Sequence, residues 1–461
     1  MTPTPVIAVF DVGKTNKKLF LFNEDYKIVY EKSARFNETA DEDGDPCENI
    51  DSLRLSVFDS LREIFKRKEF EIKAVNFSSY GASFVYVDED GAPLTPLYNY
   101  LKTYPDELHS QFYETYGGEA TVARQTSSPV LGSLNSGLQL YRLKYEQPEI
   151  FSRVKYALHL PQYLSYLISG QMFSDVTSIG CHTSLWDFEK NDYHDWVVKE
   201  GLAEKLAPIR NADAVLPAAF PGNSYEVGIG LHDSSAALIP YLVSFTEPFI
   251  LLSTGTWTIS LNPFDHSALT DEELKNDCLN YIQYKGQPVK ASRLFAGYEY
   301  EQQVKRIAAH YDKNIAHYRT IRFDADIVVK LLAEDTDKKT GATSLQASVF
   351  GQRDVSAFAS EEEAYHRLMM DIVDQQKIST GYVLKDNSVK RIFVDGGFSK
   401  NAVYMHLLAA AFPHTEVFAA SMAQATAVGA ALAIHKAWNS KPLPHDLLEL
   451  KFYSVTQNIT T

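Results

Sequence analysis

Two segments that lie half a chain apart share one layout: an apolar strand, a turn rich in Gly and Thr, and a strand of alternating apolar and polar residues. The first is FDVGKTNKKLFLF at residues 10–22, and the second is LLSTGTWTISL at residues 251–261. No low-complexity linker separates the two halves of the 461-residue chain. We therefore predict a hinged two-domain enzyme of the α/β class, with domains at residues 1–244 and 245–461.

The first turn contains Gly-Lys-Thr, which is similar to the end of a nucleotide-binding P-loop. A P-loop carries another glycine five residues before this one, and it opens a helix. Here Ala8 occupies that position, and the β-prone segment KKLFLF follows instead of a helix. The sequence therefore predicts a strand–turn–strand hairpin at this point.

Such a hairpin turn can still bind phosphate. Its backbone N–H groups and hydroxyls point in one direction, and a concave set of such donors holds phosphate oxygens. Lys14 and Lys17 add positive charge, whereas Asp11 would repel a phosphate unless Mg²⁺ lies between them. One turn from each half could grip a polyphosphate from two sides. The alternative is that both turns are ordinary hairpins built from turn-favouring residues.

A third segment, GIGLHDSSAALIPYL at residues 228–242, predicts a helix that begins at Asp233. His232 and Asp233 would lie at its N-terminus and face the space between the halves. Asp233 could then take the proton of a substrate hydroxyl that attacks phosphorus, because phosphoryl transfer needs such a base, a metal and positioned phosphate donors. The alternative is that Asp233 only caps the helix.

The segment VDGGFSKN at residues 394–401 predicts a strand, a turn at Gly396 and Gly397, and a helix that starts at Asn401. Paired glycines let a nucleotide base or ribose approach the backbone closely, although such a turn is often only a packing corner. The pattern also predicts three strands within 5–36, a helix at 51–70, two strands within 72–91, helices at 137–151 and 160–170, a strand pair within 247–264, a strand and a helix within 389–412, and a helix at 421–438.

The composition limits the partners. The formal net charge of −15 argues against nucleic acids and anionic membranes. Three scattered cysteines without CxxC spacing indicate reduced thiols, and the histidines show no recognisable metal-binding spacing. No apolar run approaches the length of a membrane span, and no signal peptide is evident. We expect a cytoplasmic protein, and the sequence leaves open whether it is a monomer or a dimer.

These segments, in this order and followed by MAQATAVGAALA, resemble the FGGY family of carbohydrate kinases of the actin/hexokinase/Hsp70-like superfamily. LLSTGTWTISLNP and GLHDSSAAL look most like the rhamnulokinase branch, and SSYGASFVYVDEDGAPL at residues 78–94 resembles the sugar loop of that branch. The resemblance implies two actin-like (ribonuclease H-like) domains, each a mixed β-sheet flanked by helices, with an active-site cleft between them. It also implies ATP and Mg²⁺ as cofactors.

The same resemblance implies roles for individual residues. Asp233 would be the general base, and Asp11 and Asp233 would bind Mg²⁺. The first phosphate loop would comprise Gly13, Lys14, Thr15, Asn16 and Lys17, and the second Thr254, Gly255 and Thr256. Gly396, Gly397 and Asn401 would border the adenosine, and the residues near the sugar would be Ser79, Tyr80, Gly81, Ser83 and His232.

Departures from the family pattern bear on the substrate. Lys14 and Asn16 stand in the first loop, where a lysine beside the β- and γ-phosphates is compatible with ATP. The rhamnulokinase acid of the sugar loop is replaced by Ser83, and a Tyr-Arg-Asp segment by YNYLK, which includes Asn99 and Tyr100. A serine cannot reproduce the paired hydrogen bonds that a carboxylate accepts. The substrate therefore need not be rhamnulose.

The leading hypothesis is an ATP-dependent kinase that phosphorylates the terminal hydroxyl of a ketose, in particular a 6-deoxyketohexose such as L-rhamnulose or L-fuculose. One alternative is a kinase for another ketose or polyol, such as xylulose, ribulose or glycerol. Another is a non-catalytic regulator that binds sugar and nucleotide. In each case the expected partners are a small-molecule sugar and ATP, with no nucleic acid and no membrane.

Overall fold

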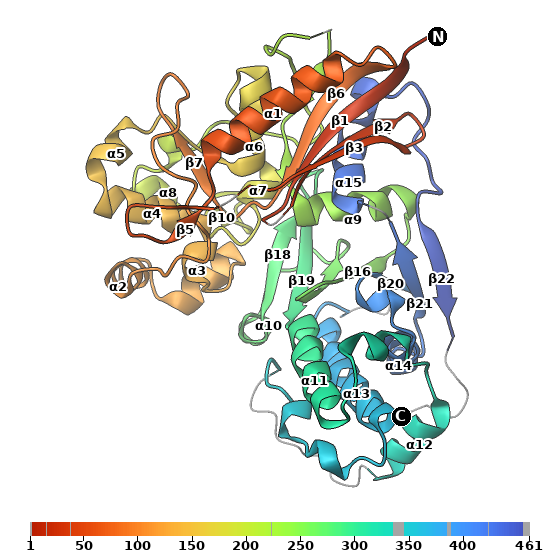
Figure 1. Ribbon diagram of the computed structural model, residues 1–461. Coiled ribbons are helices and arrows are strands. Elements are labelled where there is room, and N and C mark those ends of the chain that lie inside the picture. Colours follow the sequence, from red (N-terminus) through yellow and green to blue (C-terminus); the bar gives the residue numbers. More distant parts are fainter. Residues whose placement is uncertain are drawn as a thin grey trace.

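Two seven-stranded mixed sheets form the centre of the molecule, one above the other in Figure 1. The computed structural model describes residues 2–14, 16–36, 38–222, 224–334, 345–384, 389–422 and 424–454. The first sheet takes its strands from residues 4–232, and the second takes its strands from residues 249–453. Helices pack on both faces of each sheet, which gives a two-domain α/β fold.

The first sheet has the strand order β13–β14–β6–β1–β2–β3, and β15 also pairs with β6. Its strands are β1 (Thr4–Val12), β2 (Lys17–Asn23), β3 (Ile28–Ala34), β6 (Phe70–Ser79), β13 (Val215–Pro217), β14 (Glu226–Gly228) and β15 (Leu231–His232). The second sheet has the order β18–β19–β17–β16–β20–β21–β22. Its strands are β16 (Phe249–Thr254), β17 (Thr258–Asn262), β18 (Cys278–Ile282), β19 (Pro288–Leu294), β20 (Arg391–Gly396), β21 (Glu416–Ser421) and β22 (Glu449–Tyr453).

Both sheets contain the same three-stranded unit. In the first, β1 runs antiparallel to β2 and parallel to β6. In the second, β16 runs antiparallel to β17 and parallel to β20. The two hairpins that the sequence predicts at the Gly/Thr turns are therefore present, and each lies beside the end of a parallel strand.

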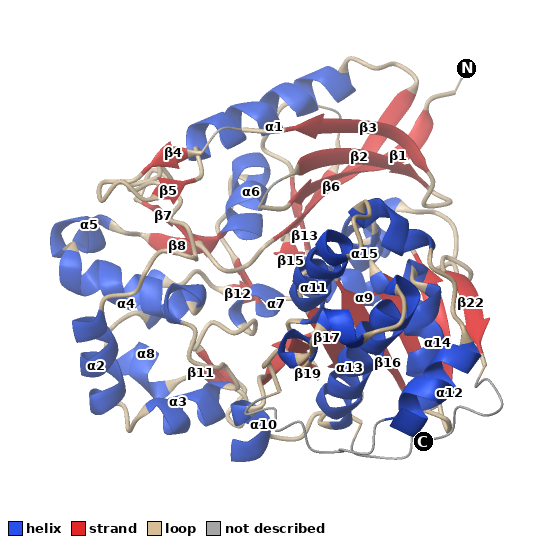
Figure 2. Ribbon diagram, turned by 60° about the horizontal axis from the view of Figure 1, so that its bottom comes forward, coloured by secondary structure: helices blue, strands red, loops and turns tan. Residues whose placement is uncertain are grey.

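Two helices, α9 (Asp233–Ser244) and α15 (Ala425–Ala433), lie side by side between the sheets in Figures 1 and 2. Apolar residues of α15 share a buried cluster with Ile7 and Phe20 of the first sheet. Leu238 of α9 packs with Phe249 and Phe393 of the second sheet. The order of layers from the first sheet to the second is therefore sheet, α15 and α9, sheet.

The remaining helices cover the outer faces and form a side lobe. On the first sheet lie α1 (Ile50–Phe65) and α6 (Leu160–Ser169), and on the second lie α11 (Ala296–His310), α12 (Ala325–Glu334), α13 (Glu361–Gly381) and α14 (Ala402–Ala411). The side lobe contains α2 (Asp106–Thr115), α3 (Glu119–Thr126), α4 (Ser136–Glu146), α5 (Pro148–Arg153), α7 (Val176–Ile179), α8 (Asp195–Lys199), and the strands β7 (Phe84–Val87) and β8 (Tyr156–His159). The short elements are β4 (Thr39–Ala40), β5 (Pro46–Cys47), β9 (Ser174–Asp175), β10 (Trp186–Asp187), β11 (Asp192–Tyr193), β12 (Ile209–Arg210), α10 (Asp271–Lys275) and α16 (His435–Trp438).

Local signals explain most helix boundaries. The side chain of Asn49 accepts a hydrogen bond from the backbone N–H of Ser52 and so caps α1. Gly170 ends α6 in the left-handed conformation with φ of 69°, which glycine adopts without strain. Pro148 divides the helix predicted at 137–151 into α4 and α5, because proline cannot donate the helical hydrogen bond.

Two predicted helix boundaries are wrong. The helix predicted at 51–70 ends at Phe65, and Phe70 already begins β6. The helix predicted at 421–438 starts only at Ala425, because Ser421 pairs with Glu449 as the last residue of β21. Among the described residues, none of the helices has the length and hydropathy that a bilayer span requires.

Candidate active site

Three parallel strands of the first sheet end at one edge and bring the predicted catalytic residues together. β1 pairs with β6 as far as Val12 and Ser79, and β15 pairs with β6 at the same Ser79 through His232. The hydroxyl of Ser79 donates to the carbonyl oxygen of Val12 at 2.9 Å. Since β1 carries Asp11 and Asp233 follows β15 directly, this edge collects both proposed metal-binding carboxylates.

Asp11 is a partly buried carboxyl group in a polar contact with α15. Its Oδ2 atom accepts a hydrogen bond from the hydroxyl of Thr426 at 2.8 Å. Burial raises the pKa of Asp11 from 3.8 to about 6, and the negative charge of Asp233 contributes to the rise although the Thr426 hydrogen bond opposes it. Asp233 is thus close enough to disfavour the ionisation of Asp11, an arrangement that favours a bound cation.

Asp233 is the first residue of α9, with a side chain that is 33% exposed. A carboxylate is stabilised at a helix N-terminus by the unpaired backbone N–H groups there. The neighbouring His232 is buried, and a Cβ at Gly81 would lie 3.0 Å from its ring. The helix start predicted at Asp233 is therefore confirmed, and Gly81 allows the sugar-loop backbone to approach His232.

The remaining predicted sugar-loop residues have different surroundings. Tyr80 is buried, and its ring centroid lies 5.6 Å from that of Tyr100. Burial raises the pKa of Tyr100, with contributions from the charges of Asp233 and Glu48, which places this tyrosine near Asp233. Ser83 is also buried, and its hydroxyl donates to the carbonyl oxygen of Tyr98 at 2.8 Å. The hydroxyl proton of Ser83 is therefore used in a contact within the protein that links the segment at Ser83 to the segment at Tyr98.

The predicted first phosphate loop is a closed hairpin turn in which the backbone N–H of Gly13 donates to the carbonyl oxygen of Asn16 at 2.9 Å. Nζ of Lys17 is buried and lies 2.8 Å from both Oε1 of Glu48 and the carbonyl oxygen of Lys14. Lys14 is more exposed and pairs with Glu38 at 3.0 Å. Thr15, which the sequence also assigns to this loop, lies outside the described residues.

The predicted second phosphate loop and the paired glycines form one unit at the edge of the second sheet. The carbonyl oxygen of Thr254 accepts a hydrogen bond from the N–H of Gly397 at 2.8 Å. The side-chain hydroxyl of Thr254 accepts a second one from the N–H of Phe398 at 3.0 Å. Gly396 has φ of 91°, and a Cβ there would lie 2.0 Å from the Thr254 carbonyl oxygen. Only glycine fits this position.

The tip of the second loop is fixed by α11. The N–H of Gly255 donates to the carbonyl oxygen of Trp257 at 2.8 Å, and the carbonyl oxygen of Thr256 accepts from the N–H of Tyr298 at 3.0 Å. Asn401 starts α14 as predicted: its side chain accepts from the N–H of Tyr404 at 3.1 Å. These contacts make the loop a fixed set of backbone groups.

One helix connects the two edges. α9 starts with Asp233 at the first sheet, and the hydroxyl of Tyr241 further along α9 donates to Oδ2 of Asp395 at 3.0 Å. Asp395 precedes Gly396 in β20, beside the second loop. Asp11, Asp233 and the second loop are therefore parts of one connected region between the sheets.

Three contributors to this region have no role in the sequence-based assignments. Thr426 is a polar residue in an Ala-rich helix, and this pattern is only a weak indication of a functional contact. Tyr100 lies in the segment YNYLK, which departs from the family pattern. Cys181 lies 3.2 Å from Nε2 of His232, and no local pattern indicates this contact because the residues are 51 positions apart.

A family model of the N-terminal domain of the FGGY family of carbohydrate kinases matches residues 6–236. A second model, carbohydrate kinase FGGY, C-terminal domain, matches residues 246–442. This chain belongs to the FGGY family of carbohydrate kinases. The resemblance that the four sequence segments indicate is confirmed, and FGGY kinases use ATP as the phosphate donor.

Curated relatives resemble this member of the FGGY family at modest identity. A rhamnulokinase from Halalkalibacterium halodurans is 24% identical over 268 residues, which are 54% of each chain. The chain thus spans about half the length of the curated relatives it matches.

The solved structures cover nearly the whole chain. A carbohydrate kinase from Novosphingobium aromaticivorans has a TM-score of 0.79 at 23% identity, with 98% of this chain and 95% of that one covered. A ligand-bound xylulose kinase from Lactobacillus acidophilus has a TM-score of 0.79 at 15% identity and covers 99% of this chain and 94% of its own. These likenesses confirm the predicted two-domain, actin-like α/β fold.

Proposed function

We propose that this FGGY kinase transfers the γ-phosphoryl group of ATP to the terminal hydroxyl of a ketose. The first candidates are 6-deoxyketohexoses such as L-rhamnulose and L-fuculose, because curated relatives carry the name rhamnulokinase. The observation that carries the proposal is the meeting of Asp11, Asp233 and Thr426 at the edge of the first sheet.

Asp233 acts as the general base in this proposal. It accepts the proton of the sugar hydroxyl while that oxygen forms a bond to the γ-phosphorus and the bond to the bridging oxygen of ADP breaks. Its place at the start of α9 supports the role, because the side chain remains partly exposed at the edge of the sheet where Asp11 also lies.

Asp11 and Asp233 are the residues that would hold Mg²⁺. They fit the ion because the two carboxylates lie close together, and partial burial and the charge of Asp233 raise the pKa of Asp11 to about 6 although Thr426 and Lys18 oppose the rise. When bound, Mg²⁺ neutralises charge on the phosphates. Thr426 fixes the orientation of Asp11 through its hydrogen bond.

The backbone turns are the proposed phosphate and adenosine contacts. Gly13, Lys14, Thr15 and Asn16 serve as the first loop, with the buried pair of Lys17 and Glu48 as its support. Thr254, Gly255 and Thr256 serve as the second loop, and Gly396, Gly397 and Asn401 border the adenosine. Ser79, Tyr80, Gly81, Ser83 and His232 form the sugar side.

The domain division at 244/245 is part of the same proposal. It is supported by the two sheets, which take their strands from residues 4–232 and 249–453. The helix α15 from the second half packs against the first sheet, so the halves share a core at this point.

The test is ADP release over a panel of ketoses and polyols, measured with wild type and a matched pair of variants. Asp233→Asn removes the base and should lower kcat by about 10²–10⁴-fold. The chain offers a matched control in Asp195, which also follows a histidine and begins a helix but is 63% exposed and pairs with Lys190 at 2.8 Å. Asp195→Asn should keep wild-type kcat.

The panel includes xylulose, ribulose and glycerol beside the 6-deoxyketohexoses. Residue 83 is a serine where the rhamnulokinase pattern has a carboxylate, and its hydroxyl donates to the carbonyl oxygen of Tyr98. The panel therefore extends beyond the 6-deoxyketohexoses. Near-normal turnover by Asp233→Asn would refute the base. Binding of sugar and ATP with no turnover of any compound would identify a non-catalytic regulator instead.

A further inference from the structure

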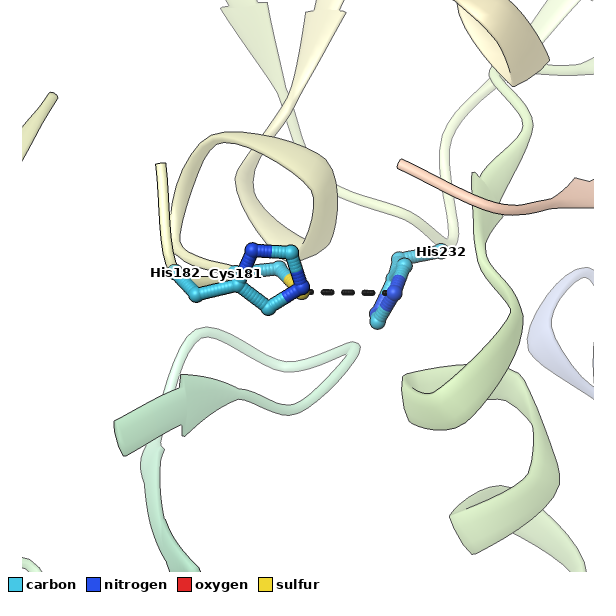
Figure 3. A group of neighbouring side chains, drawn as sticks. All are labelled: Cys181, His182 and His232. Atoms are coloured by element: carbon cyan, nitrogen blue, oxygen red, sulfur yellow. Dashed lines mark hydrogen bonds between the residues drawn. The ribbon is translucent and has the colours of Figure 1, made fainter. Parts of the chain in front are cut away.

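A group of three metal-ligating side chains lies next to Asp233, and two of its members have no role in phosphoryl transfer. Cys181, His182 and His232 each offer one donor atom, and these atoms all lie within 4.8 Å of one another. Figure 3 shows Cys181 and His182 extending from one segment toward the ring of His232. Cys181 and His232 are buried, whereas His182 retains partial exposure that gives access from solvent.

The separation of the donor atoms suits a small tetrahedral ion. Sγ of Cys181 lies 3.2 Å from Nε2 of His232. In a tetrahedral zinc site, bonds of about 2.3 Å to sulfur and about 2.0–2.1 Å to nitrogen place these two atoms about 3.6 Å apart. A slight rotation of the Cys181 side chain therefore admits the ion without backbone movement.

His182 is oriented as metal-binding histidines usually are. Its Nδ1 atom lies 3.3 Å from the carbonyl oxygen of Leu134, a contact that holds the proton on Nδ1 and leaves the lone pair of Nε2 free. Its backbone has φ of 37°, a left-handed conformation that is strained for a residue other than glycine. The side chain of Asn135 donates to its carbonyl oxygen at 2.7 Å and helps to hold this conformation.

One ring nitrogen of His232 faces both a thiol, which can donate or accept, and a carboxylate, which only accepts. Nε2 lies 3.2 Å from the thiol of Cys181 and 3.3 Å from Oδ1 of Asp233. A neutral imidazole nitrogen offers at most one proton, so it cannot donate to both groups. The ring of Tyr281 stacks on His232 at 5.9 Å and holds it in place. The sulfur of Cys181, Nε2 of His232 and Oδ1 of Asp233 thus lie close together, and a cation could bind to their lone pairs.

The other group of potential metal ligands in the described residues differs in this respect. Asp41, Asp43 and Asp45 also bring their oxygens together. Nζ of Lys102 already lies 2.6, 2.7 and 3.5 Å from their carboxylates, so a positive charge occupies that cluster.

We propose that Cys181, His182 and His232 bind a thiophilic divalent cation such as Zn²⁺, with a fourth coordination position open beside Asp233. The thiol of Cys181 releases its proton to solvent as the bond between sulfur and metal forms, and both imidazoles bind as neutral ligands. The proposal that these residues bind a metal does not depend on the proposed kinase reaction. The consequence that Zn²⁺ inhibits the enzyme, by drawing the Asp233 carboxylate toward the ion, rests on the proposed function.

The test uses Co²⁺ as an optical probe on the full-length, metal-free protein under anaerobic conditions. A thiolate ligand should give a charge-transfer band in the near ultraviolet that saturates at a single equivalent of Co²⁺ and disappears when Zn²⁺ displaces it. Cys181→Ser keeps a hydrogen-bonding group beside His232 but should remove the band and weaken binding by about 10–100-fold or more. His182→Asn should weaken binding similarly, because it removes an imidazole ligand. Asparagine tolerates the left-handed backbone at this position, so the variant should keep its fold. Cys278→Ser is the matched control at a different buried cysteine and should leave the band unchanged.

Each outcome bears on one claim. A wild-type protein without the band, or a band that persists in Cys181→Ser, overturns the metal site. In the kinase assay with excess Mg²⁺ and ATP, Zn²⁺ should inhibit wild type at concentrations at least about tenfold lower than those that inhibit Cys181→Ser. Equal inhibition of both overturns the inhibitory consequence. A normal cobalt spectrum in a protein that phosphorylates no sugar supports the metal site and refutes only the kinase proposal.

Discussion

The crossing of α9 and α15 depends on Gly429, and Gly429→Ala tests whether this crossing positions the proposed base. A Cβ at residue 429 would lie 1.8 Å from the carbonyl oxygen of Ala236 and 2.6 Å from its carbonyl carbon. Both atoms belong to the backbone of α9, so no side-chain rotation relieves the clash. Because a contact between carbon and oxygen normally measures about 3.3–3.6 Å, the helices must separate by about 1.5 Å.

This separation should affect stability and catalysis together. Overpacking a close-packed contact destabilises a protein by about 1–3 kcal/mol. The displaced helices carry Asp233 at the start of α9 and Thr426, the hydrogen-bond partner of Asp11, in α15. Since a misplacement of about 1 Å lowers a catalysed rate by about 10²-fold, we expect kcat to fall by about that factor and Tm by several degrees.

The assay combines thermal unfolding with ADP release, using the best substrate from the sugar panel. Gly381→Ala is the control, since Gly381 ends α13 and a Cβ there would meet no heavy atom of the described residues within 4 Å. It should change Tm and kcat little. Wild-type Tm and kcat in Gly429→Ala would refute the argument, and a lower Tm with unchanged kcat would show that the crossing does not position Asp233.

Two further predictions concern charged residues of the site. Burial and the charge of Asp233 raise the pKa of Asp11 from 3.8 to about 6. The protonated carboxyl group therefore contributes about 3 kcal/mol to the free energy of unfolding, a contribution that is fully present below pH 3.8 and is lost as the pH rises through about 6. Asp11→Asn should therefore exceed wild type in unfolding free energy at neutral pH without metal, and denaturant titrations that show no gain would contradict this. Lys17→Met removes the cation that pairs with the buried Glu48, which should destabilise by about 3–5 kcal/mol, whereas Lys14→Met should mainly raise KM for ATP. The reverse pattern would place Lys17 at the phosphates.

The backbone of the site could be predicted from the sequence because its signals are local. The hairpin at Gly13, the helix start at Asp233 and the turn at Gly396 each depend on residues within a few positions. Alternation, turn residues and helix periodicity record such structure directly. The fold class followed from the same segments, since the two hairpins occur half a chain apart.

The side-chain partners could not be predicted in this way. Thr426 and Asp11 are 415 positions apart, and Lys17 and Glu48 are 31 positions apart. A lysine beside a Gly-Lys-Thr turn suggests phosphate binding, yet the structure buries Lys17 against the carboxylate of Glu48. The motif gives the residue type and the backbone position, whereas the partner of the charged group depends on strands that pack from elsewhere in the chain.

The position of the proposed base follows the same reasoning one level higher. Each half places a hairpin at the end of a parallel strand pair, β1 with β6 and β16 with β20. A single helix, α9, touches both edges, through Asp233 at its start and through the contact of Tyr241 with Asp395. Because α9 contacts both sheets, we expect a shift of one sheet relative to the other to move Asp233 as well. The geometry of the base depends on how the two halves pack, which a local sequence pattern does not record.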